Sequence, residues 1–402
     1  MPFVTTPSAL RRTGRLDSFG TTVFAEMSAL AATTGAVNLG QGFPDEDGPP
    51  EVLEAAVRAI RDGHNQYPPG RGVPELLEAV AAHQERFYGL RLDAGSEVLV
   101  TAGATEAIAA SVLGLSAPGD EVVTFEPYYD SYAATIELAG ATRKVVALRP
   151  PAWNFDPDEL RRAVTARTSL LLLNSPHNPT GKVFTAEELA LISEVCRERD
   201  VVAVTDEVYE HLVFDGRHLP LAGFPEMSER TVTISSAGKT FSTTGWKIGW
   251  ATGPAALLER VRAVKQFLTF ASGTPFQLAV ATGLRLPDDA FEAIRSGHQA
   301  GRDLFCDGLE RLGWRVLRPQ ATYFATADVS AFGYRDGWSF CRHLATDAKV
   351  AAIPTEVFYD DKEAGRHLVR FAFCKRAEVI EEALARLEGL RAEAPGPRAD
   401  RR

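Results

Sequence analysis

Short apolar runs alternate with amphipathic stretches through the middle of the chain, and this alternation predicts an α/β domain. The strand-like runs, rich in β-branched residues, span residues 97–101, 121–125, 143–148, 169–174, 201–206, 231–236 and 248–252. Between them lie helical patterns such as residues 104–115 and 185–200. Strands that alternate with helices are typical of a largely parallel sheet. Because these strands are apolar along their whole length, we expect helices to cover both faces of the sheet.

The pattern changes near residue 275, where long helical segments precede a few short strands. A helical pattern spans residues 276–313, strand-like runs span 323–329, 350–354 and 367–373, and a last helix is expected over 377–392. We therefore predict four segments: an N-terminal segment (1–45) that packs on a small domain, a large domain (46–275), the small α+β domain (276–390) and a disordered tail (391–402).

Composition and charge exclude several classes of protein. The chain has 402 residues, is 45% hydrophobic and carries a formal net charge of −10. No basic block of the kind that binds nucleic acid is present. No apolar run approaches the ~18 residues of a membrane span, and the N-terminus lacks the apolar core of a signal peptide. The four cysteines form no CxxC pair and no zinc-type cluster with histidine. We expect a cytoplasmic protein with no nucleic-acid or membrane partner and no metal.

The residues that could carry chemistry follow the predicted strands, where ligands of α/β sheets bind. A small-residue turn with Ala104 and Thr105 leads from one strand into a helix and could bind an anion. Tyr129 follows the next strand, in EPYYDSY, and Asn178 lies in the rigid loop NSPHNPTGKV. Each has an ordinary structural explanation as well: a capped turn, a packing ring or a plain loop.

Two further strand ends bear charged groups. Asp206 and Tyr209 lie in TDEVYEHL, where a salt-bridged structural aspartate is the simpler alternative. The stretch SSAGKTFSTTGWKIGW holds Ser236 and two lysines, Lys239 and Lys247, among small and hydroxylated residues. An unpaired buried ammonium is costly, so either an anionic, reactive group lies against these lysines or the stretch is an unusual surface loop.

Taken together, the strand-end residues are the ones that would bind a single kind of cofactor. An aldehyde cofactor with a phosphate, a pyridine ring and a phenolate would use all of them. In this interpretation Lys239 holds the aldehyde covalently and Asp206 keeps the pyridine nitrogen protonated. Asn178 and Tyr209 hydrogen-bond the phenolate oxygen, while the turn at 103–105 and Lys247 hold the phosphate.

The sequence resembles the class I/II aminotransferases, which bind pyridoxal 5′-phosphate and have fold type I. The likeness spans roughly residues 15–390 and is greatest to N-succinyldiaminopimelate and kynurenine/glutamine aminotransferases. The motifs that carry it are AVNLGQGFPDEDGPP, NQYPPG, LVTAGATEAI, EPYYDSY, NSPHNPTGKV, TDEVYEHLVF, SSAGKTFSTTGWKIGW and HLVRFAFCKR. The resemblance implies a large domain with a mostly parallel seven-stranded sheet, a smaller α+β domain, and a homodimer with shared active sites.

The resemblance also implies roles for residues at matching positions. Lys239 matches the Schiff-base lysine, Asp206 and Tyr209 match the pyridine-nitrogen and phenolate partners, and Tyr129 matches the ring stacked on the cofactor. Ala104, Thr105, Ser236 and Lys247 match the phosphate cup, which in many relatives has arginine in place of Lys247. Relatives often have phenylalanine in place of Tyr129.

For the substrate, the resemblance implies that Arg370 and Asn178 bind the α-carboxylate, together with the backbone of Gly42. Tyr67 matches a tyrosine that reaches the phosphate from the neighbouring subunit, and Phe270 is a candidate for the partner's substrate pocket.

We therefore expect a transaminase that moves an amino group from an amino acid to 2-oxoglutarate, with N-succinyl-LL-diaminopimelate as the best candidate donor. The alternatives are a broad-specificity kynurenine, glutamine or methionine aminotransferase, a cysteine-S-conjugate β-lyase or a decarboxylating deaminase on the same scaffold, and a non-catalytic ligand-binding protein that kept the fold.

Overall fold

A seven-stranded, mostly parallel sheet forms the larger part of the computed structural model, which describes residues 19–390. Its strands are β2 (Val98–Thr101), β3 (Glu121–Glu126), β4 (Thr142–Ala147), β5 (Thr168–Asn174), β6 (Val202–Asp206), β7 (Thr231–Ser236) and β8 (Gly249–Thr252). They are ordered β2-β8-β7-β6-β5-β3-β4, and β8 runs antiparallel to both of its neighbours. The α/β fold class predicted from the sequence is confirmed.

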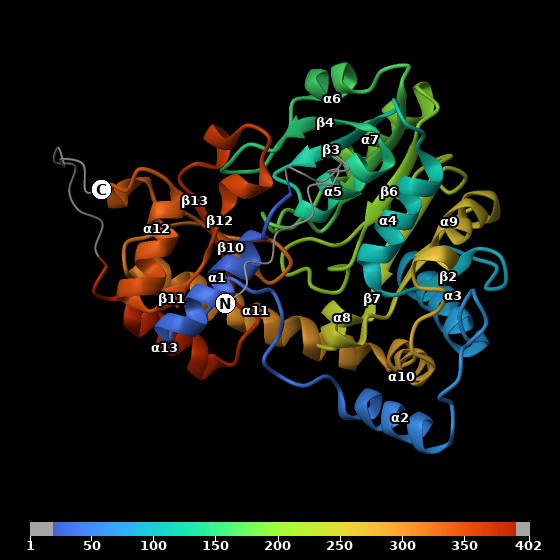
Figure 1. Ribbon diagram of the computed structural model, residues 1–402, viewed down its shortest axis with the longest axis horizontal. Coiled ribbons are helices and arrows are strands. Elements are labelled where there is room, and N and C mark those ends of the chain that lie inside the picture. The colour runs from blue at the N-terminus through green and yellow to red at the C-terminus, as the bar shows by residue number, and fades with distance from the viewer. Residues whose placement is uncertain (1–18, 391–402) are drawn as a thin grey trace, which may run out of the picture.

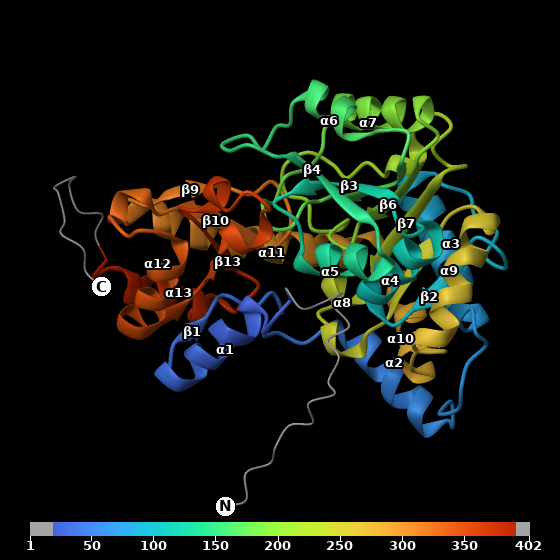
Figure 2. The ribbon, with the colours of Figure 1, turned by 45° about the horizontal axis from the view of Figure 1, so that its top comes forward.

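Helices cover both faces of this sheet, as the apolar strands predicted. On one side lie α4 (Gly103–Leu115), α5 (Asp130–Ala139) and α9 (Ala255–Leu268), and on the other lie α6 (Pro157–Ala163) and α7 (Ala186–Glu198) (Figure 2). Alternate residues of β5 point to opposite faces. Leu170 and Leu172 pack in the α4 layer, whereas Leu171 and Leu173 pack against α7.

The β2–β8 edge of the sheet has its own helical cover. It consists of α3 (Pro74–Tyr88) and α10 (Thr274–Leu284), and α2 (Pro50–Arg61) packs on α10. Two short elements follow β7: helix α8 (Ala237–Thr240) and the 3₁₀ turn η2 (Thr244–Trp246). Both therefore lie at the carboxyl edge of the parallel strands.

A smaller antiparallel sheet lies beside the large one (Figure 1). Its order is β12 (Ile353–Pro354), β13 (Leu368–Ala372), β10 (Phe324–Asp328) and β9 (Arg315–Leu317). The helices around it are α11 (Asp288–Arg311), α12 (Gly337–His343) and α13 (Ala377–Leu387). The remaining short turns are η1 (Leu221–Gly223), η3 (Ser330–Phe332), η4 (Leu344–Ala348, a π-turn), η5 (Thr355–Phe358) and η6 (Lys362–Gly365).

The described part of the N-terminal segment packs on this smaller sheet. Helix α1 (Val23–Thr34) buries Val23, Met27 and Ala31 in the core that the smaller sheet shares. The two-residue strand β1 (Val37–Asn38), which the pattern did not predict, pairs in parallel with β11 (Val350–Ala351). The predicted boundaries at residues 45 and 275 stay predictions, and the predicted tail (391–402) lies outside the described residues.

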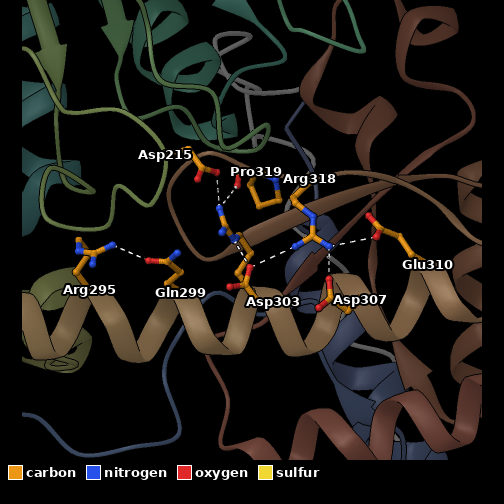
Figure 3. Close-up of polar contacts among 9 residues, drawn as sticks. Asp215, Arg295, Gln299, Asp303, Asp307, Glu310, Arg318 and Pro319 are labelled. Carbon is orange, nitrogen blue, oxygen red and sulfur yellow. Dashed lines mark hydrogen bonds and ion pairs between the residues drawn. The ribbon is translucent and has the colours of Figure 1, made fainter.

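Helix α11 is joined to neighbouring loops by two arginines (Figure 3). The buried Arg302 donates to Asp215 Oδ2 at 2.5 Å and to the carbonyl oxygen of Pro319 at 3.2 Å. Arg318 forms ion pairs with three carboxylates of the helix, Asp303, Asp307 and Glu310. Asp215 belongs to the loop that follows β6, so the network fixes this loop against α11.

Among residues 19–390, no helix combines the length and the apolar character needed to cross a membrane.

Candidate active site

The carboxyl ends of the parallel strands surround a cavity of about 260 Å³. It is lined by all of the predicted site residues except Tyr67, namely Gly42, Ala104, Thr105, Tyr129, Asn178, Asp206, Tyr209, Ser236, Lys239, Lys247 and Arg370. The topology explains the convergence, because strands β5, β6 and β7 are neighbours that run in the same direction. Arg370 comes from β13 of the smaller sheet, so the cavity lies where the two sheets meet.

Lys239 lies on α8, directly after strand β7, and is half-buried. Its Nζ atom donates to the carbonyl oxygen of Gly42 at 3.4 Å and lies 5.5 Å from the centre of the Tyr323 ring. Burial lowers the pKa of Lys239 to about 8, although the nearby Asp206 acts in the opposite direction. A substantial fraction of this amine is therefore neutral near physiological pH and available as a nucleophile or base.

Asp206 ends strand β6 and is only 5% exposed. Its Oδ2 atom accepts a 2.5 Å hydrogen bond from the hydroxyl of Tyr132. Burial raises the pKa of Asp206 to about 6, despite the hydrogen bond from Tyr132 and the charge of Lys239. A carboxylate in this environment is stabilised by a further proton or cation on the cavity side.

The N-terminus of α4 and Lys247 form a positively charged cradle. Helix α4 begins at Gly103 without a side-chain cap, and the first amides of a helix have no partner within it. A Cβ atom placed on Gly103 would lie 3.2 Å from Lys247 Nζ, so the ammonium sits beside the positive end of the helix dipole. Two positive groups in contact are mutually unfavourable unless an anion binds between them, and a phosphate suits both.

Arg370 is almost completely buried, with 1% of its surface exposed. It donates to Asn178 Oδ1 and to the carbonyl oxygen of Gly40, both at 3.0 Å, and its guanidinium lies 4.0 Å from the centre of the Phe324 ring. Burial lowers its pKa to about 10, which leaves it protonated at neutral pH. Its Nε atom has no partner although it is buried. A carboxylate ligand would satisfy this atom through the bidentate geometry that arginine favours.

Three other predicted residues line the cavity from different elements. Asn178 accepts from Arg370 and donates its own backbone N–H to Asn174 Oδ1 at 2.7 Å. The ring of Tyr209 is buried and meets the Tyr323 ring edge-on at 5.3 Å. Burial raises the pKa of Tyr129 to about 12, so its phenol stays protonated.

Sequence reasoning missed residues that hold the predicted ones in place. Tyr132 supports Asp206, and Asn174 links β5 to the backbone of Asp206 through a 2.7 Å hydrogen bond. The signal for Tyr132 was present, because it lies three residues after Tyr129 at the start of α5 and so shares its helix face. Asn174 ends an apolar strand, where a polar side chain needs a partner.

Tyr67 and Phe270 do not line the cavity of their own chain. Their rings meet edge-on at 5.4 Å on the surface, where 83% of Tyr67 and 52% of Phe270 are exposed. In this chain, both side chains therefore lie on the surface and outside the cavity lining.

Comparisons with known proteins agree with this geometry. The profile of the family described as "Aminotransferase class I and II" matches residues 34–387. The chain is 54% identical over 387 residues to a Mycobacterium tuberculosis protein named "Probable N-succinyldiaminopimelate aminotransferase DapC", covering 94% of this chain and 98% of the relative. It is 40% identical to the methionine aminotransferase of Escherichia coli, over 94% of this chain and 97% of the relative. The solved structure of N-succinyldiaminopimelate aminotransferase from Mycobacterium tuberculosis superposes with a TM-score of 0.92 at 55% identity, covering 94% of this chain and 99% of that one.

Proposed function

The chain belongs to the class I and II aminotransferases, and we propose that it transfers the amino group of N-succinyl-LL-diaminopimelate to 2-oxoglutarate. The enzyme depends on pyridoxal phosphate, as members of this family do. The choice of donor rests on one observation: the chain is similar to the Mycobacterium tuberculosis relative over nearly its whole length.

The residues of the cavity suit pyridoxal phosphate. In this proposal the amides at the start of α4, Thr105, Ser236 and Lys247 hold the phosphate, where the helix terminus and the lysine leave a positive charge unmatched. Asp206 faces the pyridine nitrogen, which would supply the proton that its raised pKa favours. When bound, the cofactor supplies an electron sink that stabilises negative charge at the substrate Cα.

Several side chains act around the reacting atoms. Lys239 holds the cofactor and then moves a proton to and from the substrate Cα, a task for which a pKa of about 8 is well placed. Tyr209 and Asn178 hydrogen-bond the phenolate oxygen, and Tyr129 packs on the ring. Arg370 fixes the α-carboxylate of both amino donor and oxo acid, with its unpartnered Nε atom completing the contact.

The charges of the cavity restrict how the distal succinyl carboxylate can be bound. Its lining lysines and arginine among the described residues are Lys239, Lys247 and Arg370, and the proposal already assigns all three. The succinyl group therefore needs polar donors or a cation from outside this lining. Gln41 also lines the cavity, but its side-chain amide already donates to the carbonyl oxygen of Phe24 and to Ser28 Oγ. It would have to exchange one of these bonds to bind the succinyl group.

We also propose that the enzyme is a homodimer in which Tyr67 reaches the phosphate site of the partner. The exposure of Tyr67 and its absence from the lining of its own cavity support this arrangement. A reducing, cytoplasmic setting is part of the same proposal, and the four free cysteines support it.

The choice of donor is tested by steady-state kinetics with 2-oxoglutarate as acceptor and a panel of amino donors. We expect the highest kcat/KM for N-succinyl-LL-diaminopimelate, well above methionine, glutamine and kynurenine. The 40% identity to a methionine aminotransferase makes methionine the strongest competitor. If methionine or kynurenine gives the highest value, the broad-specificity alternative replaces the proposal.

The same assay separates transamination from lyase chemistry. A transaminase produces glutamate and stops without an oxo-acid acceptor, whereas a β-lyase releases pyruvate from a cysteine S-conjugate with no acceptor present. As a control, Lys239→Ala should lose both the transfer and the covalent cofactor adduct that borohydride reduction traps in the wild type. A fully active Lys239→Ala variant would remove Lys239 from the proposed role.

A further inference from the structure

A cluster of histidine and glutamate side chains lies outside the active-site cavity. His83 is on helix α3, and Glu210 and His211 are in the turn that follows β6. The Nε2 atoms of His83 and His211 are 2.7 Å apart, and one ligand atom from each of the three residues lies within 4.8 Å of the others. His83 is 1% exposed and Glu210 is 6% exposed. The cluster is thus assembled inside the protein rather than on a flexible surface.

The close approach of the two imidazoles marks a position that a metal ion can take. At 2.7 Å, one Nε2 atom donates a hydrogen bond to the other. A metal ion would replace the shared proton, which is released to solvent. Two imidazole nitrogens and a carboxylate oxygen this close together form a donor set that binds a divalent metal ion.

The contacts around the cluster leave room for a bound cation. The neighbouring Glu207 is paired with His218 at 2.6 Å. Glu210 forms no ion pair of its own among the described residues; it accepts a 2.5 Å hydrogen bond from Ser235 and is hydrogen-bonded to Tyr88. Arg86, whose charge acts on His211, is paired with Asp288. A metal ion would therefore give Glu210 the cationic partner that it lacks among these contacts.

We propose that His83, Glu210 and His211 bind a divalent transition-metal ion of the zinc type. At Zn–N bonds of about 2.0–2.1 Å, two nitrogens of a tetrahedral site lie about 3.3 Å apart, so the imidazoles need to separate by about half an ångström. The rings of Phe87 and Phe291 pack on His211 at 4.8 and 4.5 Å and shield the position from solvent. A water molecule can complete the coordination on the side of His211, which is only partly buried.

The metal would stabilise the structure around the active site and would take no part in the reaction. None of its three ligands lines the active-site cavity. Glu210 and His211 directly follow Tyr209, in the segment that begins at Asp206. An ion that joins α3 to this turn would hold Asp206 and Tyr209 in position. His83 lies 128 positions before His211, and the three ligands match no zinc spacing, which is why sequence analysis predicted no metal.

The test uses the untagged, full-length enzyme loaded with cofactor and depleted of metal by a chelator followed by dialysis. Zn²⁺ alone is then added, and bound metal is measured by mass spectrometry and calorimetry. We expect one ion per chain and a higher Tm. His83→Ala removes a ligand and should weaken Zn²⁺ binding by more than the roughly tenfold that loss of a supporting residue alone can cost, whereas His64→Ala, which alters an exposed histidine elsewhere, should not. Failure to bind one ion per chain, or equal affinity in His83→Ala and the wild type, overturns the proposal.

A second measurement does not depend on a variant that folds. Co²⁺ bound by two imidazoles and a carboxylate at low coordination number should give intense visible absorption in the wild type, and Zn²⁺ should displace it. If Co²⁺ gives only the weak absorption of the hydrated ion, the cluster is a hydrogen-bonded group and no metal site exists. Because the readouts are metal content and Co²⁺ absorption, they are independent of which amino donor the enzyme uses.

Discussion

At the scale of single residues, burial of the Asp206 carboxylate lowers the stability of the cofactor-free fold, although the reaction needs this carboxylate. Raising its pKa from 3.8 to about 6 means that ionised Asp206 destabilises the cofactor-free fold by about 3 kcal/mol. The cost is absent below pH 3.8 and fully present above about pH 6, because only the ionised form is penalised. Asp206→Asn should therefore stabilise the cofactor-free protein near pH 8 and leave its stability unchanged near pH 4, as measured by urea unfolding.

The same substitution should impair the reaction. Asparagine keeps the shape and accepts the hydrogen bond from Tyr132, but it cannot carry the negative charge that favours a protonated pyridine nitrogen. We expect kcat to fall by two or more orders of magnitude, since about 1.4 kcal/mol of lost stabilisation is a factor of ten. Near-normal turnover in Asp206→Asn would contradict the role assigned to Asp206.

The lowered pKa of Lys239 predicts how the rate of cofactor attachment depends on pH. Because burial places its pKa at about 8, the rate at which the cofactor-free protein attaches pyridoxal phosphate should rise with pH and level off above about pH 8. An exposed lysine would show a rate that still increases toward pH 10.5. Stopped-flow absorbance over this range distinguishes the two curves, provided that the fold is checked by circular dichroism at each pH.

Sequence alone predicted the residues that face the cavity better than those that hold them. Asp206 and Lys239 were found because each lies near the carboxyl end of a recognisable strand, where chemistry is expected. Asn174 escaped notice because its role depends on a pairing between neighbouring strands β5 and β6, which the sequence pattern does not specify. The convergence of His83 with His211 was hidden for the same reason, since 128 positions separate them.

At the scale of elements, the close approach of β8 to the start of α4 shapes the phosphate cradle. A Cβ atom on Gly249 would lie 2.7 Å from the backbone carbon of Gly103 and 2.8 Å from the amide nitrogen of Ala104. Gly249→Ala must therefore push the turn out of position, and overpacking of this kind costs about 1–3 kcal/mol. We expect a weaker affinity for pyridoxal phosphate and a lower Tm.

Gly245→Ala is the matched control, because a Cβ atom on Gly245 meets nothing within 4 Å although it lies in the neighbouring turn η2. Fluorescence titration of the cofactor-free variants measures both affinities. If both variants bind the cofactor as the wild type does, the turn at the start of α4 can accommodate the extra methyl group, and the prediction is wrong.

The elements themselves were largely predictable because their patterns are strong. Helix α7 begins as expected after Thr185, whose side chain forms a reciprocal capping box with Glu188. The strands of the large sheet agree with prediction to within about a residue at each end, as hydrophobic patterning allows. In contrast, β1 and β9 have two and three residues, too few to show a period, and they form only because a partner strand is present.

At the scale of the whole molecule, exposed apolar side chains gather where the end of α9 and the residues after it meet the loop between α2 and α3. Tyr67, Phe267, Leu268 and Phe270 are 83%, 85%, 49% and 52% exposed. Large exposed aromatic groups close together are typical of a surface that binds another protein. Two-fold symmetry is the commonest among soluble oligomers, and in such a dimer this surface would lie against the partner subunit. Phe267→Ser should then shift the protein toward monomer in sedimentation experiments.

The proposed sharing of active sites between subunits predicts complementation between two inactive variants. Suppose that Tyr67 serves the partner's cavity while Lys239 serves its own. Tyr67→Ala and Lys239→Ala should then each have little activity, yet a mixed dimer contains one intact site, formed by Lys239 of the first variant and Tyr67 of the second. After random exchange of equal amounts, half of the dimers are mixed, so about a quarter of all sites should be intact.

A matched mixture shows whether the recovery comes from sharing. Lys239 and Arg370 line the same cavity of one chain, so a mixture of Lys239→Ala and Arg370→Ala leaves no intact site in any dimer and should stay inactive. The measurement is specific activity after unfolding and refolding each mixture together. Recovery in the first mixture alone places Tyr67 across the interface. No recovery in either, from variants shown to dimerise, means that every active site is built from a single chain and that Tyr67 has another role.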